Sequence, residues 1–102
     1  MSRIYNKDAN HDEIKQAYIE AHLDVIDTAG VGGGFPDLVV GGYHQKLEIP
    51  YTALVEIKTA DGKLRPNQKH LQDNWRGCIF TVRTRAEALA VFGIEIAAAR
   101  EG

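Results

Sequence analysis

The chain has only one cysteine and no long apolar run, which argues against a disulfide-linked protein and against a membrane-spanning one. Of 102 residues, one is cysteine. Cys78 therefore has no partner for an internal disulfide, which fits a reducing cytoplasm. No stretch approaches the roughly 18 apolar residues of a membrane span, and the N-terminus MSRIYNKDANHDE lacks the apolar centre of a signal peptide. We therefore expect a cytoplasmic domain without a membrane segment.

The length and composition predict a single domain covering residues 1–102. Hydrophobic residues make up 44% and charged residues 25%, which is usual for a globular fold. The net charge of −2 hides an asymmetry, because residues 1–57 carry −5, residues 58–85 carry +5 and residues 86–102 carry −2. An acidic segment that could bind a cation thus precedes a basic segment that could meet phosphates. On charge alone, solvated surface faces remain the preferred explanation.

Hydrophobic periodicity and turn residues predict the order α-β-β-β-α-β-α. The expected helices cover residues 10–22, 66–75 and 84–92, and the expected strands cover 23–28, 36–40, 51–58 and 78–83, with a hairpin connection over 41–50. Three consecutive strands can form an antiparallel meander, and the fourth, reached across a helix, should pair in parallel. The sequence therefore predicts an α/β fold with a mixed four-stranded sheet flanked by helices.

Local patterns predict how these helices start and pack. Asn10 with Glu13, and Thr84 with Glu87, have the spacing of capping boxes. On the 66–75 helix, Leu71 and Trp75 are expected to reach the core, which would turn Gln68 on the same face inward. Cys78 opens the apolar run CIFTV and is expected to be a small buried side chain.

Three charged residues in apolar strands form the main functional candidate. Asp37 stands in FPDLVV, and Glu56 and Lys58 stand in LVEIK. Glu56 and Lys58 are two positions apart and therefore share one face of a strand. Two carboxylates from neighbouring strands could hold Mg²⁺, with the backbone carbonyl of Ile57 as a further ligand. The lysine could then face a water or a phosphate, which is the arrangement needed for metal-dependent phosphodiester hydrolysis.

Each candidate also has a simpler explanation. Glu56 and Lys58 could be an exposed ion pair of little energetic value, although an apolar strand is a costly place for unpartnered charges. Gln68 could orient Lys58, the water or the phosphate, or it could bond to backbone at the helix start. Glu13 is explained by its capping box alone.

The remaining motifs carry less information. The glycine cluster GVGGGFPD lacks the Gly-Lys-Ser/Thr and the following helix of a phosphate-binding loop, so its glycines are expected to allow a close backbone approach beside Asp37. Cations that could line a nucleic-acid groove are Lys63, Arg65, Lys69, Arg76, Arg83 and Arg85. For any single one of them, ordinary surface charge is the simpler explanation.

The ordered set of motifs resembles the PD-(D/E)XK nuclease superfamily. Pro36-Asp37 matches the first half of its signature, and Glu56-Ile57-Lys58 matches the second half. Within that superfamily the chain is similar to the VRR-NUC family, especially its short stand-alone phage members. The similarity runs from the first helix through VIDTAGVGGGFPDLVVG, LVEIK and LRPNQ to NWRG and FTVRTRAEALAVFG.

The resemblance implies a restriction-endonuclease-like core and specific roles for the matched residues. It implies metal binding by Glu13, Asp37 and Glu56, a catalytic Lys58, and Gln68 as part of the site, with Mg²⁺ or Mn²⁺ as cofactor. Stand-alone members resemble Holliday-junction resolvases that act as homodimers on branched, four-way DNA. A flap or nicking endonuclease, a non-catalytic nucleic-acid-binding module of the same fold, and an accessory protein that binds an acidic partner are the alternatives.

Overall fold

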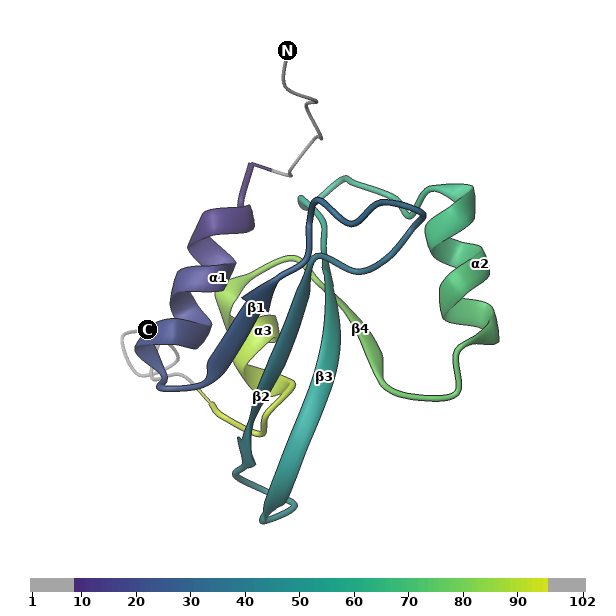
Figure 1. Cartoon of the computed structure of the whole chain (residues 1–102). Helices are drawn as coiled ribbons and strands as arrows, with labels where there is room; N and C mark the ends of the chain where they lie inside the picture. Colours follow the sequence, from purple (N-terminus) through teal and green to yellow (C-terminus); the bar gives the residue numbers. More distant parts are fainter. Residues whose placement is uncertain (1–8, 96–102) are drawn as a thin grey trace.

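The structure, a computed structural model, describes residues 9–95 (Figure 1). In chain order its elements are α1 (His11–Glu20), β1 (Asp24–Asp27), β2 (Leu38–His44), β3 (Ile49–Ile57), α2 (Pro66–Asn74), β4 (Ile79–Val82) and α3 (Arg85–Ala90). This order is the one predicted from the sequence.

One four-stranded sheet, in the order β1-β2-β3-β4, organises the domain. The first three strands are an antiparallel meander, and β4 pairs in parallel with β3. The predicted mixed sheet is therefore confirmed. Because β2 enters the sheet where β3 leaves it, the start of β2 and the end of β3 meet at one edge.

The hydrophobic core lies on the face of the sheet that α1 and α3 cover (Figure 1). Strand residues alternate between the two faces, so every second side chain of β2 and β3 enters this core. The largest side chains buried there are Tyr18 and Phe92, which meet edge to face with ring centroids 6.2 Å apart. Around them lie Ile14, Leu38, Val40, Val55, Ile57, Val82 and Leu89. This packing fixes the register of the sheet. The opposite face of the sheet is not part of this core.

α2 stands at the opposite face and is mostly polar, with the sequence PNQKHLQDN. Its buried residue is Gln68, while Leu71 is half-buried. Trp75, which follows the helix, is 45% exposed. The expectation that Trp75 packs into the core is therefore wrong, because polar side chains hold α2 at the sheet.

Two further expectations are corrected by the arrangement of the strands. β2 and β3 extend into the predicted hairpin connection, which shrinks to residues 45–48. Cys78 is exposed rather than buried, because it precedes β4 in the connecting loop. There the hydroxyl of Tyr51 lies 3.3 Å from its Sγ.

The helix starts agree only in part with the predicted capping boxes. Thr84 accepts a hydrogen bond from the N–H of Glu87 and caps α3 as expected. The Glu87 carboxylate, however, accepts from the N–H of Arg83. Asn10 does not cap α1 with its side chain, because that side chain is engaged elsewhere, at the ends of β3 and β4.

Within residues 9–95 the longest helix has 10 residues. None of the helices there combines the length and the apolar character that crossing a membrane requires.

The Thr84 cap can be tested by substitution. We expect Thr84→Ala to lower the free energy of unfolding by about 1 kcal/mol, because the Glu87 N–H loses its acceptor. Thr84→Ser keeps an acceptor and should retain most of the stability. Urea unfolding followed by circular dichroism measures both variants, and equal loss in the two would show that the hydroxyl is not the cause.

Candidate active site

Asp37 is fixed by three backbone contacts at the edge where β2 begins. Its N–H donates to the carbonyl of Val55 (2.9 Å), and its carbonyl accepts from the N–H of Thr28 (2.8 Å). Its carboxylate oxygen Oδ2 accepts from the N–H of Ile57 (2.8 Å). Asp37 therefore extends the β2–β3 pairing by one position, which places it beside Glu56 as the sequence suggested.

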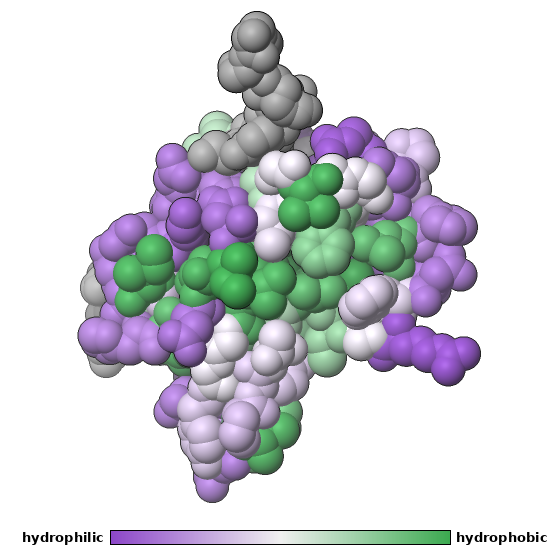
Figure 2. Space-filling view, in the orientation of Figure 1, coloured by the Kyte–Doolittle hydropathy of each residue, from purple (hydrophilic) through white to green (hydrophobic). Residues whose placement is uncertain are grey.

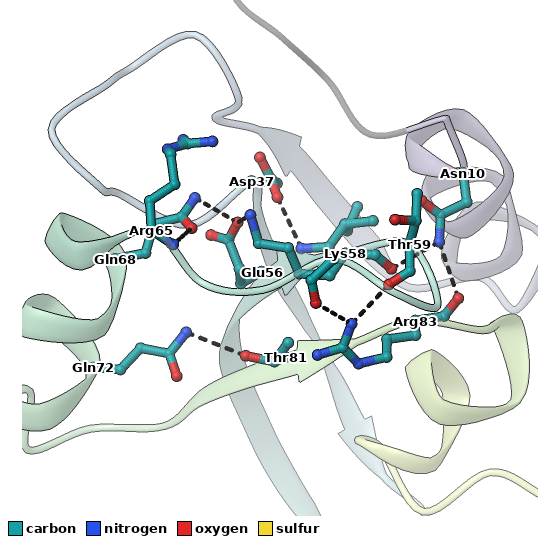
Figure 3. Close-up of polar contacts among 12 residues, drawn as sticks. Asn10, Asp37, Glu56, Lys58, Thr59, Arg65, Gln68, Gln72, Thr81 and Arg83 are labelled. Carbon is teal, nitrogen blue, oxygen red and sulfur yellow. Dashed lines mark hydrogen bonds and ion pairs between the residues drawn. The ribbon is translucent and has the colours of Figure 1, made fainter.

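Glu56 and Lys58 lie on the face of β3 that points away from the core, and both are buried. Glu56 is 2% exposed and Lys58 is 5% exposed. The Lys58 ammonium nitrogen lies 3.5 Å from Oε2 of Glu56. The simpler explanation of an exposed ion pair is therefore wrong, because both groups are buried on the side of the sheet where α2 lies (Figure 3).

Gln68 connects α2 to this pair: it makes the backbone bond considered for it at the helix start, and its other bond goes to Glu56 instead of Lys58. Its amide nitrogen donates to Oε2 of Glu56 (2.9 Å). Its amide oxygen accepts from the backbone N–H of Arg65 (2.8 Å) at the start of the helix. One side chain thus satisfies a helix terminus and holds a buried carboxylate, which fixes the first turn of α2 over the site (Figure 3).

The electrostatics of the pair depend on burial. The pKa of the Glu56 carboxyl is raised from 4.5 to about 8: burial raises it most, the nearby Asp37 charge also raises it, and the Lys58 ammonium partly offsets both. Two carboxylates this close disfavour each other's ionised form. A cation between them would favour the charged form of both, so the site is suited to bind one.

Two residues brace the backbone around Lys58, a role that the sequence did not indicate for either of them. The Asn10 amide nitrogen donates to the carbonyls of Lys58 (3.1 Å) and Arg83 (2.9 Å). The Arg83 guanidinium donates to the carbonyls of Thr59 and Gly62, each at 2.7 Å. Asn10 therefore ties the ends of β3 and β4 together, and Arg83 holds the loop after Lys58 (Figure 3). Neither contact has a local sequence signal.

A cavity of about 240 Å³ opens beside Asp37. It lies between the glycine loop and the start of α2, and its lining is Ala29, Gly32, Gly33, Gly34, Phe35, Asp37, Arg65, Asn67 and Gln68. Gly34 has a φ of +82°, and a Cβ there would come within 2.8 Å of the Asn67 carbonyl oxygen. The glycine is therefore required for the loop to touch α2, and the predicted close approach is made to protein backbone.

The described part of the chain contains no group of three or more His, Cys, Asp or Glu side chains arranged to hold a metal ion. Asp37 and Glu56 form a pair, while Glu13 is exposed on α1. Magnesium sites often use one or two carboxylates together with waters and substrate phosphates, so this pair fits such an ion. Metal binding by Glu13 and by the Ile57 carbonyl remains a prediction.

Five of the six cations considered for DNA are exposed: Lys63, Arg65, Lys69, Arg76 and Arg85. The sixth, Arg83, is half-buried and donates to backbone carbonyls. Arg65 lines the cavity, and Lys63 lies two positions before it in the loop. Lys69 on α2 pairs with Asp73 at 3.2 Å. Arg76 lies past the far end of α2, about 12 Å further along than Gln68. The first three therefore cluster near the candidate site, and Arg76 does not.

Comparison with known proteins gives one family. The model of the VRR-NUC domain matches residues 4–92. No curated protein and no solved structure matches the chain.

The raised pKa of Glu56 predicts a pH-dependent stability. A carboxyl whose folded pKa exceeds its unfolded value contributes stability below about pH 4.5, and this contribution is lost as the pH rises through about 8. Glu56→Gln, which stays neutral, should therefore be increasingly more stable than the wild type over that range, by at most about 1.4 kcal/mol per pH unit.

Urea unfolding in EDTA at several pH values measures this difference. Glu20→Gln, at an exposed position on α1, is the control and should follow the wild type. A Glu56→Gln variant with the wild-type pH dependence would contradict the assignment.

Proposed function

The chain belongs to the VRR-NUC family, a family of PD-(D/E)XK-type nucleases, and from this premise we propose that it is a Mg²⁺-dependent, structure-specific endonuclease. We further propose that it resolves four-way DNA junctions as a homodimer. The observation that carries the proposal is the buried set of Glu56, Lys58 and Gln68 beside Asp37. Burying a carboxylate and an ammonium at a sheet edge costs free energy, and apolar side chains would stabilise the fold at least as well. The pair is therefore better explained by function than by stability.

Asp37 and Glu56 are the residues that would hold Mg²⁺ or Mn²⁺, with the Ile57 carbonyl and Glu13 as further proposed ligands. When bound, such an ion would polarise the phosphate and lower the pKa of a water. The hydrogen bond from the Ile57 N–H engages only Oδ2 of Asp37, so its second oxygen is available to a cation. The Glu56 carboxylate is oriented by Gln68.

Lys58 is the proposed catalytic cation. Its ammonium lies beside Glu56, where it can orient the attacking water or stabilise charge that develops on the phosphate. Because Asn10 binds the Lys58 carbonyl and Lys58 N–H donates to the Val82 carbonyl, the backbone that carries this ammonium is held on both sides. Fixed groups stabilise a transition state better than mobile ones, because they need no reorganisation.

DNA would be held mainly through its phosphates by Lys63, Arg65 and Lys69, which lie at the loop and the start of α2. Such binding releases counterions and should weaken steeply with salt. Arg65 lines the same cavity as Asp37, which suits a phosphate next to the one being cut.

Paired cuts explain the proposed homodimer. Resolution of a four-way junction needs two cleavage sites, and the described chain carries one candidate site, so two copies related by a two-fold axis would supply them. A flap or nicking endonuclease is the alternative within the enzyme class, because it needs one site only. A non-catalytic DNA-binding module is disfavoured, because Glu56 contacts Lys58 and Gln68 and lies close to Asp37.

The role of Lys58 gives the most direct test. Lys58→Ala should reduce the cleavage rate by about two to four orders of magnitude, as loss of a transition-state contact does. Binding to a four-way junction should stay near the wild-type level. Lys46→Ala, at an exposed hairpin position paired with Glu95, is the matched control and should cleave normally. Wild-type cleavage by Lys58→Ala would remove the lysine from the mechanism.

Metal dependence and substrate are tested with purified protein on labelled four-way, flap and linear duplex DNA. We expect cleavage of the four-way junction with Mg²⁺, little cleavage of linear duplex, and none of either in EDTA. Preferred cleavage of the flap would favour the alternative enzyme. Salt-sensitive binding without cleavage under any metal would favour the non-catalytic module.

A further inference from the structure

The cavity beside Asp37 has two walls that take no part in the proposed metal chemistry. One wall is the glycine-rich loop between β1 and β2, with Ala29 and Phe35, and the other is the start of α2, with Arg65 and Asn67. The volume of about 240 Å³ is much larger than one phosphate group and has room for a nucleobase. Figure 2 shows neutral and hydrophobic surface where this loop lies, next to hydrophilic surface over α2.

The loop wall is held by contacts of its own. At its base, the Thr28 N–H donates to the Asp37 carbonyl and the Thr28 hydroxyl donates to the Pro36 carbonyl, each at 2.8 Å. Inside the loop, the Phe35 N–H donates to the Gly32 carbonyl at 3.1 Å. A wall that is already ordered lowers the entropic cost of binding.

The charges in the lining of the cavity balance. Arg65 supplies one cation and Asp37 one carboxylate, and the other residues of the lining are uncharged. A phosphate inside the cavity would face the Asp37 carboxylate, whereas phosphate sites depend on cations. The lining therefore favours an uncharged part of a nucleotide. Arg65 is exposed, so its guanidinium can still meet the phosphate of that nucleotide outside the cavity.

Asn67 and Phe35 offer the two kinds of contact that a base makes. Within residues 9–95 the Asn67 amide has no protein partner, because the side-chain hydrogen bonds donated by α2 come from Gln68, Lys69, Gln72 and Asn74. An amide carries donors and an acceptor, as the edge of a base does. Phe35, which is half-buried, supplies an aromatic ring on which a base can stack.

We propose that this cavity binds one unpaired nucleobase, from a nucleotide next to the phosphate that is cut; the inference rests on the proposed function. The base stacks on Phe35 and bonds to the Asn67 amide, while Arg65 meets the phosphate of the same nucleotide. A paired base cannot enter, because it lies inside the stack and its edge is occupied by its partner.

The cavity links the choice of DNA to unpaired nucleotides. Asp37 lines the cavity and belongs to the proposed metal-binding pair, so the bound base is adjacent to the cut. Every base of a linear duplex is paired, whereas a flap supplies unpaired bases and a four-way junction can open at its centre. The cavity therefore disfavours linear duplex without any reading of sequence.

An abasic scan tests the base site without cleavage. In EDTA, each nucleotide next to the branch point of a flap and of a four-way junction is replaced in turn by an abasic unit, and fluorescence anisotropy measures the affinity. In the DNA that binds more tightly, loss of the base at one position should weaken wild-type binding by about tenfold, because stacking and a hydrogen bond are lost. The absence of any such position overturns the proposal.

Ala29→Leu fills the cavity and leaves Asp37, Glu56 and Lys58 unchanged. This variant should bind the intact DNA about tenfold more weakly than the wild type does, and should bind the intact and abasic DNA equally. Ala86→Leu, the same change at an exposed position of α3, is the matched control and should discriminate as the wild type does. Wild-type discrimination by Ala29→Leu overturns the proposal.

Asn67→Ala is a second variant that leaves the loop unchanged. It should lose part of the discrimination between intact and abasic DNA, because the hydrogen bond is removed and the stacking stays. Circular dichroism confirms that each variant is folded. Full discrimination by Asn67→Ala would overturn the assigned amide contact.

Cleavage assays with Mg²⁺ separate this inference from the proposed function. A wild type that cleaves branched DNA and shows no effect of any abasic unit sinks the base site and leaves the proposed function standing. A wild type that shows the abasic effect in EDTA, but cleaves no DNA with any metal, does the opposite.

Discussion

The enclosure of the Glu56 carboxylate is the constraint on which the rest of the structure depends. A carboxylate removed from water is stable only with partners, and here they come from different parts of the chain: Lys58 two positions along the strand, and Gln68 on α2. Because Gln68 also accepts from the start of its own helix, the carboxylate determines where α2 begins. Asp37 then adds a second negative charge at the same edge. Such an arrangement is poorly explained as a device for stability and well explained as a site for a cation.

The polar attachment of α2 links the candidate site to the outer face of the sheet. A helix that docked through leucines would bury the apolar side chains on the outer face of the sheet and would need no glutamine there. This helix instead uses Gln68 and Gln72, which close the site and leave Ile26 in water. The same choice of side chains therefore shapes the proposed catalytic centre and leaves apolar side chains of the sheet exposed.

Much of the fold follows from the sequence because the signals are local. The alternating and continuous apolar runs predict the strands, and the Thr84–Glu87 spacing predicts the start of α3, which the Thr84 hydroxyl does cap. The proximity of Asp37, Glu56 and Lys58 could be predicted from the sequence, because it follows from side-chain alternation along a strand and from the pairing of neighbouring strands. The expected burial of Trp75 and Cys78 failed because helical or strand periodicity does not reveal which neighbours an element has. The role of Asn10 could not be predicted at all: its spacing to Glu13 matches a cap, and its real partners lie 48 and 73 positions away.

That long reach has a consequence for synthesis of the protein. The amide of residue 10 meets the carbonyl groups of residues 58 and 83, so the brace behind Lys58 cannot exist until four fifths of the chain has left the ribosome. Before then, the strand bearing the acids and the lysine has neither its parallel neighbour nor its anchor. The proposed catalytic centre is therefore braced only after residue 83 has been made, when β4 can also join the sheet.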